Sequence, residues 1–362
     1  MTQANVLAQL GSAGVSTGFK NRIINGAMTI DQRNAGASVT MNGGYTLDRW
    51  DSEVSQSSKL SVQQQTSVVP TGFTYAMALT SLSAYSVGSS ETFNIKTIIE
   101  GFNCADLSWG TASASTATLS FWVRSSLTGT FGGAFQNGDN DRSYPFSYTI
   151  NSANTWEQKT VTVTGDTTGT WGKTNGRGIQ IRFSLGAGST YSGTAGAWTA
   201  GDKRTVTGAT SVVGTNGATF YITGVQLEVG NTATDFEYRP YGTELQLCQR
   251  YYQQYGRVGA RSDRFIGVLT GTTGVFSSKF IVPLRTSPTI TYYGTNSSTG
   301  TFTIDHNNGT ANNPNVSAIA ATSSNEYAFS YNVNSLTSGA ATLWTDIGTN
   351  SGQLGFTVSA EL

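Results

Sequence analysis

Charged residues are scarce in this chain, and neither sign predominates. Only 12% of the 362 residues are charged, and 21 Lys and Arg balance 21 Asp and Glu. Nucleic acids and anionic membranes attract proteins through a net positive field, which this composition does not provide. The sequence also lacks both an apolar run of about 18 residues and an N-terminal signal-peptide pattern. We therefore expect no nucleic-acid partner, no membrane insertion and no export by that route.

Cysteine and histidine are nearly absent, with two Cys and one His in the whole chain. Cys104 and Cys248 lie far apart in the sequence, which argues against a disulfide framework and predicts two buried free thiols in a chain that folds in a reducing cytoplasm. The single histidine, His306, lies in the polar run TIDHNNGT, which is typical of a hairpin turn. These residues do not make a zinc site, and a Ser-His-Asp triad would have to include that turn histidine.

Other catalytic and metal-binding patterns are weak. Asp139 and Asp141 have the spacing that begins a calcium loop, but the twelfth position, where a glutamate is needed, is Ile150, so a solvated turn is the alternative. Two carboxylates of a glycosidase can meet only in the fold, so the sequence leaves that arrangement open. The shortage of catalytic side chains predicts a protein that is not an enzyme and that needs no cofactor.

Short alternating apolar runs, closed by Gly, Ser, Thr and Asn, fill most of the chain. Segments such as ATLSFWVRSS, GIQIRFSLG and ATFYITGVQLEVG show the period of two that predicts half-buried strands. Their number and their glycine-rich connections predict an all-β fold, with a jelly-roll sandwich over residues 21–241. A second strand series predicts a smaller β-sandwich over residues 257–362.

The segment TELQLCQRYYQQYG, residues 243–256, is the part of the sequence that favours a helix. Pro240 and Gly242 interrupt the strand pattern, Thr243 and Gln246 match a capping box, and we predict a short linking helix over 242–256. The spacing a, d, a, d would place four residues on one apolar seam: Leu245, Cys248, Tyr252 and Tyr255. This seam could pack within its own chain or bring copies together around an axis. In a rival assignment, Tyr251, Gln253 and Tyr255 already begin the next strand.

Four aromatic residues lie in predicted loops that are rich in Gly, Ser and Thr: Trp109, Trp171, Tyr191 and Trp198. Loop aromatics with small polar neighbours suit stacking on sugar rings, because the rings pack on C–H faces while hydroxyls and amides take hydrogen bonds. They are our candidate glycan-binding residues. In the alternative, these loops fold back and bury the rings as plugs. Trp122 lies on the strand face opposite Phe121 and Val123, and the sequence does not decide which side of the sheet this face forms.

Several segments, in this order, resemble the tail-fibre and related receptor-binding structural proteins of tailed bacteriophages, and most closely those of marine and cyanobacterial phages. They are GFKNRIINGAMTIDQRN, YTLDRW, IKTIIEG, ATLSFWVRS, TWEQKTVTV and ITGVQLEVGNTATDFEYRPYGTELQLCQRYYQQYG. The resemblance covers residues 17 to about 256, and the last segment is its most specific part. It implies that the first domain is a jelly roll similar to carbohydrate-binding modules. It also implies a virion location, usually as a homotrimer.

The resemblance further implies that the N-terminal part attaches to the particle and that distal domains face the host. Val6, Leu7 and Leu10, followed by the flexible tract GSAGVSTG, suit such attachment within residues 1–20. The expected partners are other copies of the chain, other virion proteins, and host polysaccharide or lipopolysaccharide. We expect a non-enzymatic fibre protein that is assembled in the host cytoplasm and binds cell-surface glycan. The alternatives are a structural adaptor or decoration protein of the virion and, from another class, a polysaccharide depolymerase.

Overall fold

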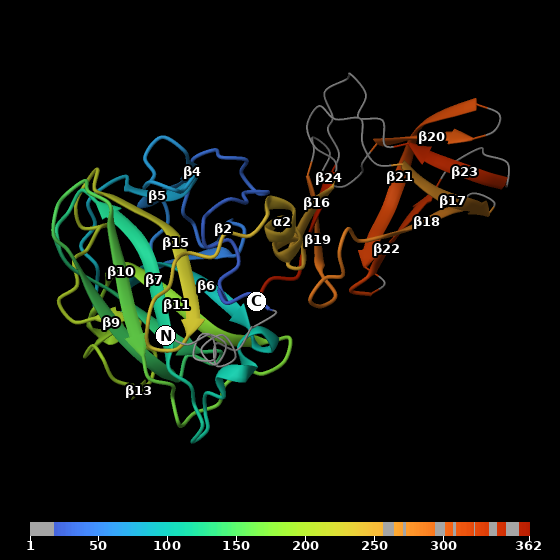
Figure 1. The fold of residues 1–362 in the computed structure, drawn as a ribbon. Coiled ribbons are helices and arrows are strands. Elements are labelled where there is room, and N and C mark those ends of the chain that lie inside the picture. Colours follow the sequence, from blue (N-terminus) through green and yellow to red (C-terminus); the bar gives the residue numbers. More distant parts are fainter. Residues whose placement is uncertain are drawn as a thin grey trace, which may run out of the picture. The chain divides into compact units, whose positions relative to one another are not determined.

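The computed structural model describes residues 18–255, 264–270, 273–293, 301–306, 309–321, 323–332, 339–344 and 355–362. The chain forms two compact units, one that ends at Pro240 and one that starts at Tyr241 (Figure 1). The candidate attachment residues Val6, Leu7 and Leu10 lie outside the described residues. Among the residues that are described, no helix is both long and apolar enough to cross a bilayer.

Two antiparallel sheets form the body of the first unit. The six-stranded sheet has the order β1 (Val39–Thr40), β4 (Leu60–Gln65), β5 (Ala76–Ser81), β15 (Thr219–Val229), β7 (Ala117–Ser125) and β10 (Glu157–Val163). The seven-stranded sheet has the order β13 (Thr199–Ala200), β9 (Arg142–Ile150), β8 (Gly129–Asn137), β11 (Arg177–Ala187), β6 (Thr92–Glu100), β3 (Trp50–Val54) and β2 (Gly44–Leu47). The predicted all-β sandwich of jelly-roll type is thereby confirmed.

Short elements complete the first unit. They are the parallel pair β12 (Ser192–Gly193) and β14 (Thr205–Val206), and the 3₁₀ turns η1 (Gly101–Asn103), η2 (Ala105–Leu107) and η3 (Ser189–Tyr191). The pair and η3 belong to the long segment between β11 and β15, which in Figure 1 runs through the yellow-green part of the chain. This segment supplies several residues of the site described below.

Alternation along the strands decides which side chains fill the core. In β7, Phe121 and Val123 are fully buried, whereas Trp122 and Arg124 between and after them are partly exposed. Successive side chains of a strand point to opposite faces, so one face of each sheet is apolar and packs on the other sheet. The ring of Phe121 meets that of Phe183 of β11, in the opposite sheet, with centroids 5.0 Å apart. This contact joins the two layers.

The segments that carry the phage resemblance hold the two ends of the first unit together. The backbone N–H groups of Lys20 and Asn21 each donate to the carboxylate of Glu237 at 3.0 Å. The guanidinium of Arg239 donates to the carbonyl oxygens of Asn21 and Ile23. These residues of GFKNRIINGAM and ATDFEYRP therefore have a structural role, because they connect the N-terminal and C-terminal parts of the first unit.

The second unit is also built from strands. A three-stranded sheet has the order β16 (Tyr252–Tyr255), β24 (Gly355–Ser359) and β19 (Thr289–Tyr293). A closed barrel has the order β17 (Arg264–Thr270), β18 (Thr273–Lys279), β22 (Glu326–Asn332), β21 (Gly309–Ala321), β20 (Thr301–His306) and β23 (Gly339–Trp344). The sequence predicts a second, smaller β-sandwich over residues 257–362; the second unit is built of strands as predicted, but its larger part is a closed barrel. His306 ends β20 and pairs with Gly309 of β21.

The helix of the described part is shorter than predicted and starts earlier. α2 spans Tyr241–Gln249, directly after Pro240, and residues 252–255 form β16, which pairs with β24. The prediction of a helix over 242–256 is therefore wrong at its C-terminal end. The rival assignment, in which this end already forms the next strand, is correct. Neighbouring β24 offers backbone partners to a segment rich in tyrosine, which suits a strand.

This boundary also removes the predicted helical seam. Leu245 and Cys248 belong to α2, whereas Tyr252 and Tyr255 belong to β16, so the four do not share one face of a helix. Cys248, Tyr252 and Tyr255 are 0, 6 and 7% exposed within the single chain. Packing inside the chain accounts for these three residues.

Both cysteines are free and buried, as the sequence predicts. Burial raises the pKa of the Cys104 thiol to about 12, so its reactive thiolate is almost absent at neutral pH. We expect the native protein to react slowly with Ellman's reagent and to release the signal of both thiols after unfolding in urea. Rapid reaction of both thiols without denaturant would contradict this burial.

Candidate functional site

Three of the four loop aromatics form one cluster inside the fold. The ring centroids of Trp109, Trp171 and Trp198 are 4.8 to 5.4 Å apart in edge-to-face geometry, and Trp109 and Trp171 are 2 and 7% exposed. Each indole N–H donates to a backbone carbonyl, at 2.7 to 3.2 Å. The prediction that Trp109 and Trp171 stack on glycan is wrong, because the core already covers their faces. The plug alternative describes these loops.

The other two candidates are partly exposed. Trp198 packs with its ring centroid 5.2 Å from that of Tyr144 and so closes the outer side of the tryptophan cluster. Tyr191, at the end of η3, lies under the guanidinium of Arg204, whose central carbon is 4.0 Å from the ring centroid. A cation this close to an aromatic face is attracted by the negative electrostatic potential of the π electrons. Tyr191 therefore borders a different, charged region.

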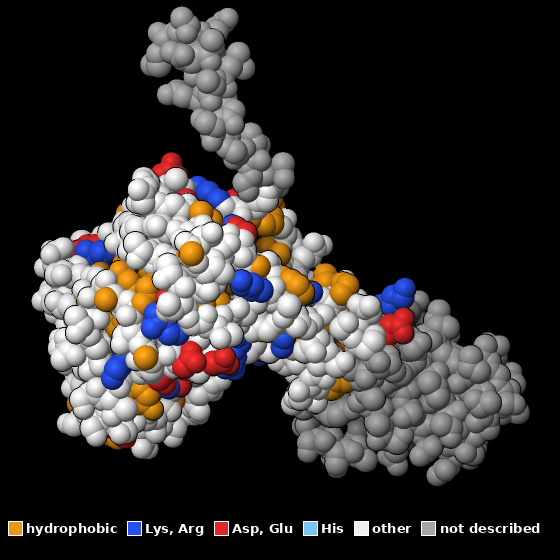
Figure 2. Space-filling view, turned by 90° about the horizontal axis from the view of Figure 1, so that it is seen from below, with side chains coloured by type: hydrophobic (Ala, Val, Ile, Leu, Met, Phe, Trp, Pro, Cys, Tyr) orange, Lys and Arg blue, Asp and Glu red, His pale blue; other side chains and the backbone are white. Residues whose placement is uncertain are grey.

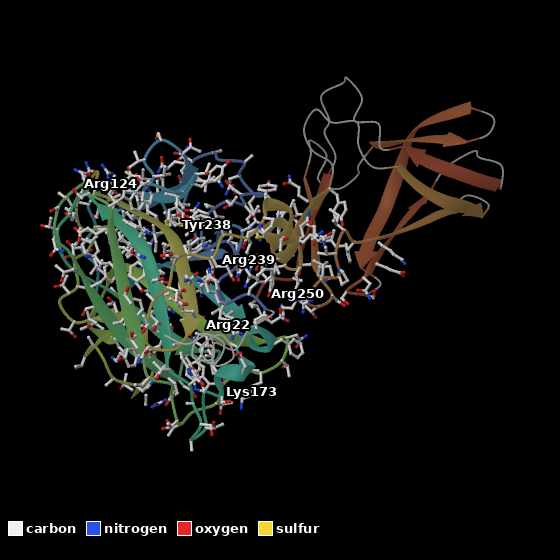
Figure 3. All side chains as sticks on the ribbon, viewed as in Figure 1. Arg22, Arg124, Lys173, Tyr238, Arg239 and Arg250 are labelled. Carbon is white, nitrogen blue, oxygen red and sulfur yellow. The ribbon has the colours of Figure 1, made fainter. Side chains whose placement is uncertain are left out.

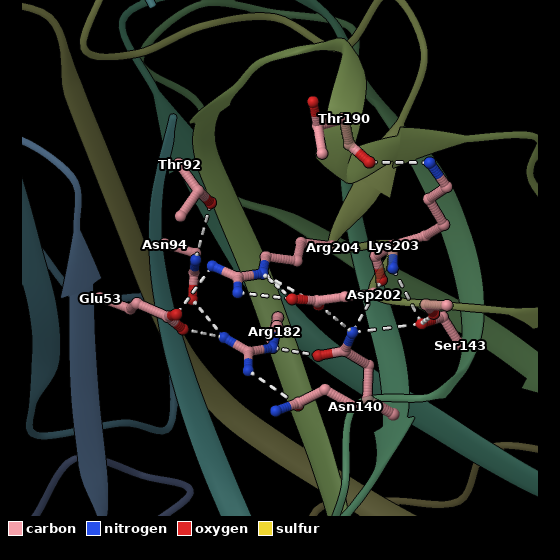
Figure 4. Close-up of polar contacts among 12 residues, drawn as sticks. Glu53, Thr92, Asn94, Asn140, Ser143, Arg182, Thr190, Asp202, Lys203 and Arg204 are labelled. Atoms are coloured by element: carbon pink, nitrogen blue, oxygen red, sulfur yellow. Dashed lines mark hydrogen bonds and ion pairs between the residues drawn. The ribbon is translucent and has the colours of Figure 1, made fainter. Parts of the chain in front are cut away.

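That region, here called the ion-pair cluster, lies on the outer face of the seven-stranded sheet (Figure 4). Its charged members are three acids and three bases: Asp51, Glu53, Asp202, Lys96, Arg182 and Arg204. Glu53 of β3 receives hydrogen bonds from Arg182 of β11 and, at 2.7 Å, from Arg204. Arg204 also donates to Asp202 at 2.6 Å. The cluster thus ties the segment between β13 and β14 to the sheet.

Amide side chains satisfy the remaining polar atoms of the ion-pair cluster. The Gln136 carbonyl accepts from Arg182, and its amide nitrogen donates to Asp202 at 2.7 Å. Asn140 accepts from Gln180 at 2.7 Å and from Arg182 at 3.2 Å. Gln136 and Gln180 are fully buried and Arg182 is 1% exposed. Balanced charges with complete hydrogen bonding make a buried network tolerable, and such a network fixes one arrangement of the loop.

The protonation states of Glu53 and Asp202 limit the chemistry that these two acids can perform. Burial alone would raise the pKa of Glu53, but the charges of Arg182, Lys96 and Arg204 outweigh it and lower the pKa to about 2. Hydrogen bonds from Arg204 and Gln136 likewise outweigh burial and lower the pKa of Asp202. A glycosidase general acid must hold a proton near neutral pH. Neither Glu53 nor Asp202 suits that role.

The calcium candidates lie in the turn between β8 and β9. Asp139 and Asp141 are both exposed, and Asp141 accepts a hydrogen bond from the side chain of Asn137. In the part of the chain that the structure describes, no three His, Cys, Asp or Glu side chains come together as a metal site. The turn borders an open hollow of about 350 Å³, lined by Gly138, Asp139, Thr170, Gly172 and Arg177.

The outer face of the six-stranded sheet carries partly exposed rings that the glycan candidates did not include. This surface, here called the aromatic face, consists of Phe73, Trp122, Trp156, Tyr221, Phe236 and Tyr238. At one end, the ring of Tyr221 meets that of Trp156 at 6.2 Å and lies 5.0 Å below the guanidinium carbon of Arg124. Tyr238, at the other end, is 59% exposed.

A β-bulge connects the two ends of the aromatic face. Pairing of β15 with β7 is interrupted between Thr223 and Gln226, and Gly224 in the bulge has φ +60°. A Cβ on Gly224 would lie 2.6 Å from the ring of Phe73 and 3.1 Å from that of Trp122. Both rings therefore pack directly against the bare backbone, and a glycine is required there.

Strand alternation contained a signal for part of this face. Trp122 alternates with buried Phe121 and Val123, and Tyr221 alternates with buried Phe220 and Ile222. The pairing of Thr223 with Trp122, and of Tyr221 with Arg124, shows that these side chains share the outer face. Phe73, Phe236 and Tyr238 come from connecting segments, and no local pattern places them there.

Comparisons with known proteins give weak structural similarities. No protein-family model matches the chain, and no curated protein matches it. Among solved structures, the enzymatically active domain of tailspike protein 4 from bacteriophage CBA120 shares 11% identity and a TM-score of 0.34, over 58% of this chain and 22% of that one. The carbohydrate-binding module TmCBM61, solved with β-1,4-galactotriose, shares 11% identity and a TM-score of 0.31, over 59% of this chain and 100% of that one.

A third similar structure is the family 11 carbohydrate-binding module of the cellulosomal cellulase Lic26A-Cel5E of Clostridium thermocellum. It shares 12% identity and a TM-score of 0.27, over 55% of this chain and 99% of that one.

The ion-pair cluster predicts an acid-sensitive contribution to stability. The folded-state pKa of Glu53, about 2, is below the ordinary glutamate value of 4.5, so the ionised carboxylate stabilises the fold above about pH 4.5 and this contribution is lost as the pH falls toward 2. We expect Glu53→Gln to lower the free energy of unfolding by about 2 kcal/mol at neutral pH, and by much less near pH 3. Urea unfolding followed by fluorescence measures this, with Asp235→Asn, which removes an exposed carboxylate outside the cluster, as the control. An equal loss at both pH values would contradict the assignment.

The tryptophan cluster predicts a stability effect without a binding effect. We expect Trp109→Ala to lower the free energy of unfolding by about 3 to 5 kcal/mol, because it leaves a cavity among edge-to-face rings. Trp198→Ala should cost clearly less, since its ring is partly exposed. Denaturant unfolding of both variants compares them. A Trp109→Ala protein as stable as the unchanged chain would show that the ring is not part of the core.

Proposed function

We propose that the first unit binds host-surface glycan through the aromatic face, as part of a non-enzymatic virion protein of a tailed phage. The observation that carries the proposal is the set of partly exposed rings on the outer face of the six-stranded sheet. In a sandwich of this size, apolar rings that remain outside the core cost free energy unless a partner covers them. A sugar ring, with an apolar C–H face and polar edges, is a partner of matching chemistry.

Hydrogen-bonding groups lie beside these rings. Gln158 of β10 pairs across the sheet with Trp122 and is exposed, and the guanidinium of Arg124 lies over Tyr221. Amide and guanidinium groups donate to sugar hydroxyls and so set the orientation of a ring stacked on the aromatic side chain. On the face that Figure 2 shows, the described surface is mostly uncharged, with small groups of positive and negative side chains. Such a surface favours neutral polyols over polyanions.

The virion part of the proposal is supported by the segments NRIINGAM, YTLDRW and ATDFEYRP, which resemble phage tail-fibre proteins. In this setting the chain would form homotrimers, attach to other virion proteins through residues 1–20, and present its sandwich to host polysaccharide or lipopolysaccharide. Three copies on one particle convert weak sugar contacts into useful avidity. No cofactor or catalytic group enters this mode of action.

Two substitutions test the glycan proposal. We expect Trp122→Ala to weaken binding to the best-bound glycan of an array by about tenfold, since loss of one stacked ring costs about 1.4 kcal/mol. Phe102→Ala is the matched control, because Phe102 is 60% exposed but lies in η1, outside the aromatic face. Equal binding of both variants would refute the role of the aromatic face.

Adsorption to host cells separates glycan binding from the adaptor alternative. Particles that carry the Trp122→Ala chain should adsorb less, while particle assembly stays unchanged. If assembly fails and purified chain binds no glycan, the aromatic face contacts another virion protein instead. Release of reducing ends from host polysaccharide by the purified chain would favour the depolymerase alternative.

A further inference from the structure

We infer that the open hollow beside the β8–β9 turn is a second binding site of the first unit, which takes one neutral sugar ring. The hollow of about 350 Å³ is lined by Gly138, Asp139, Thr170, Gly172 and Arg177. This volume lies at the lower end of the range for ligand pockets, roughly 300 to 1,000 Å³. The inference rests on the proposed function, since it assigns a further site for the same class of ligand.

Three separate segments build the hollow, and a buried amide holds two of them in place. Asn137, which is fully buried, accepts the N–H groups of Asp141 and Arg142 at 3.1 and 3.2 Å and thereby shapes the turn. Its amide nitrogen donates to the carbonyl of Thr170 at 3.0 Å, which fixes the turn against the loop before β11. Walls that are already held in place lose little conformational freedom when a ligand binds.

One wall of the hollow is bare main chain. A Cβ on Gly172 would lie 2.1 Å from the carbonyl oxygen of Arg177, so any side chain there would push the loop and β11 apart. The neighbouring ring of Trp171 belongs to the buried tryptophan cluster and is 7% exposed. The loop therefore places Trp171 in the core and lies close against β11 at Gly172, so this segment contributes no aromatic side chain to the hollow.

The chemistry of the lining suits vicinal hydroxyl groups. Asp139 and Arg177 are exposed, and within residues 18–255 neither side chain has a hydrogen-bond or ion-pair partner. A carboxylate accepts hydrogen bonds from sugar hydroxyls and a guanidinium donates to their oxygens, and Thr170 adds a hydroxyl that does both. The two opposite charges cancel, so the hollow favours a neutral ring. A uronate or a phosphate would face the carboxylate of Asp139.

The hollow and the aromatic face are different places on the first unit. Arg124, which marks the aromatic face, and Lys173, next in sequence to Gly172, appear toward opposite ends of the sandwich in Figure 3. With two sites, one unit could bind two sugar residues of the same glycan chain or of neighbouring glycan chains. Their contributions can therefore be measured separately.

The test uses the full chain, labelled with ¹⁵N, and methyl glycosides of glucose, galactose and mannose, with glucuronate as the charged comparison. We expect at least one neutral glycoside to shift the amide signals of Gly138 and Gly172. Asp139→Asn and Arg177→Gln should each weaken its binding about tenfold or more, as expected for loss of a charged hydrogen bond. Asp235→Asn, which removes an exposed carboxylate elsewhere, is the matched control.

The results distinguish this inference from the proposed function. If the chain binds glycan on an array but no neutral glycoside shifts Gly138 and Gly172, or glucuronate alone does so, the hollow is not the site inferred here. The same holds if both variants bind the glycosides as tightly as the unchanged chain. If the amides shift but Trp122→Ala leaves array binding unchanged, the hollow stands and the role of the aromatic face falls.

Discussion

The packing of two apolar sheet faces against each other is the constraint on which the first unit depends. Each strand gives alternate residues to the space between the sheets, where contacts such as that of Phe121 with Phe183 join the layers. Once that register is set, the residues between the inward-facing ones must point to the outer face of their sheet. Trp122 and Tyr221 point outward because their neighbours point inward, and Glu53 and Arg182 meet on the other outer face for the same reason. Both candidate surfaces are consequences of the core.

The two outer faces differ in how many of their side chains already have interaction partners within the chain. On the seven-stranded sheet, the ion-pair cluster matches each acid with a base, and buried amides such as Gln136 take the remaining bonds. That face is occupied by the chain's own segment between β13 and β14. On the six-stranded sheet, the segment that contains Phe236 and Tyr238 adds rings to those of the strands and leaves them partly open. The aromatic face therefore has exposed ring surface that a ligand can cover, and the proposed function depends on this surface.

Large aromatic residues have two opposite roles in this protein. Trp109 and Trp171 close the end of the sandwich, where glycine-rich loops fold back far enough for edge-to-face contacts. By this closure the same loops leave the hollow that Gly172 lines without an aromatic side chain. The two proposed sites then combine a stacking surface with a polar recess whose two charges, those of Asp139 and Arg177, are of opposite sign. This combination suits a passive surface protein whose affinity comes from several weak contacts.

The sequence by itself determined the all-β class, the two series of strands, and the burial of both cysteines, because a period of two and a short apolar run are local properties. The sequence also indicated, by strand alternation, that Trp122 faces away from Phe121 and Val123. Only the tertiary structure decided that residues 252–255 join a sheet, since the partner β24 comes about a hundred residues later in the chain. The same holds for the loop tryptophans. The composition of their loops is equally compatible with buried rings and with rings exposed for sugar stacking, and burial depends on contacts between three loops that are distant in the sequence. Composition fixes what a side chain can contact, whereas the fold fixes which contacts are already taken.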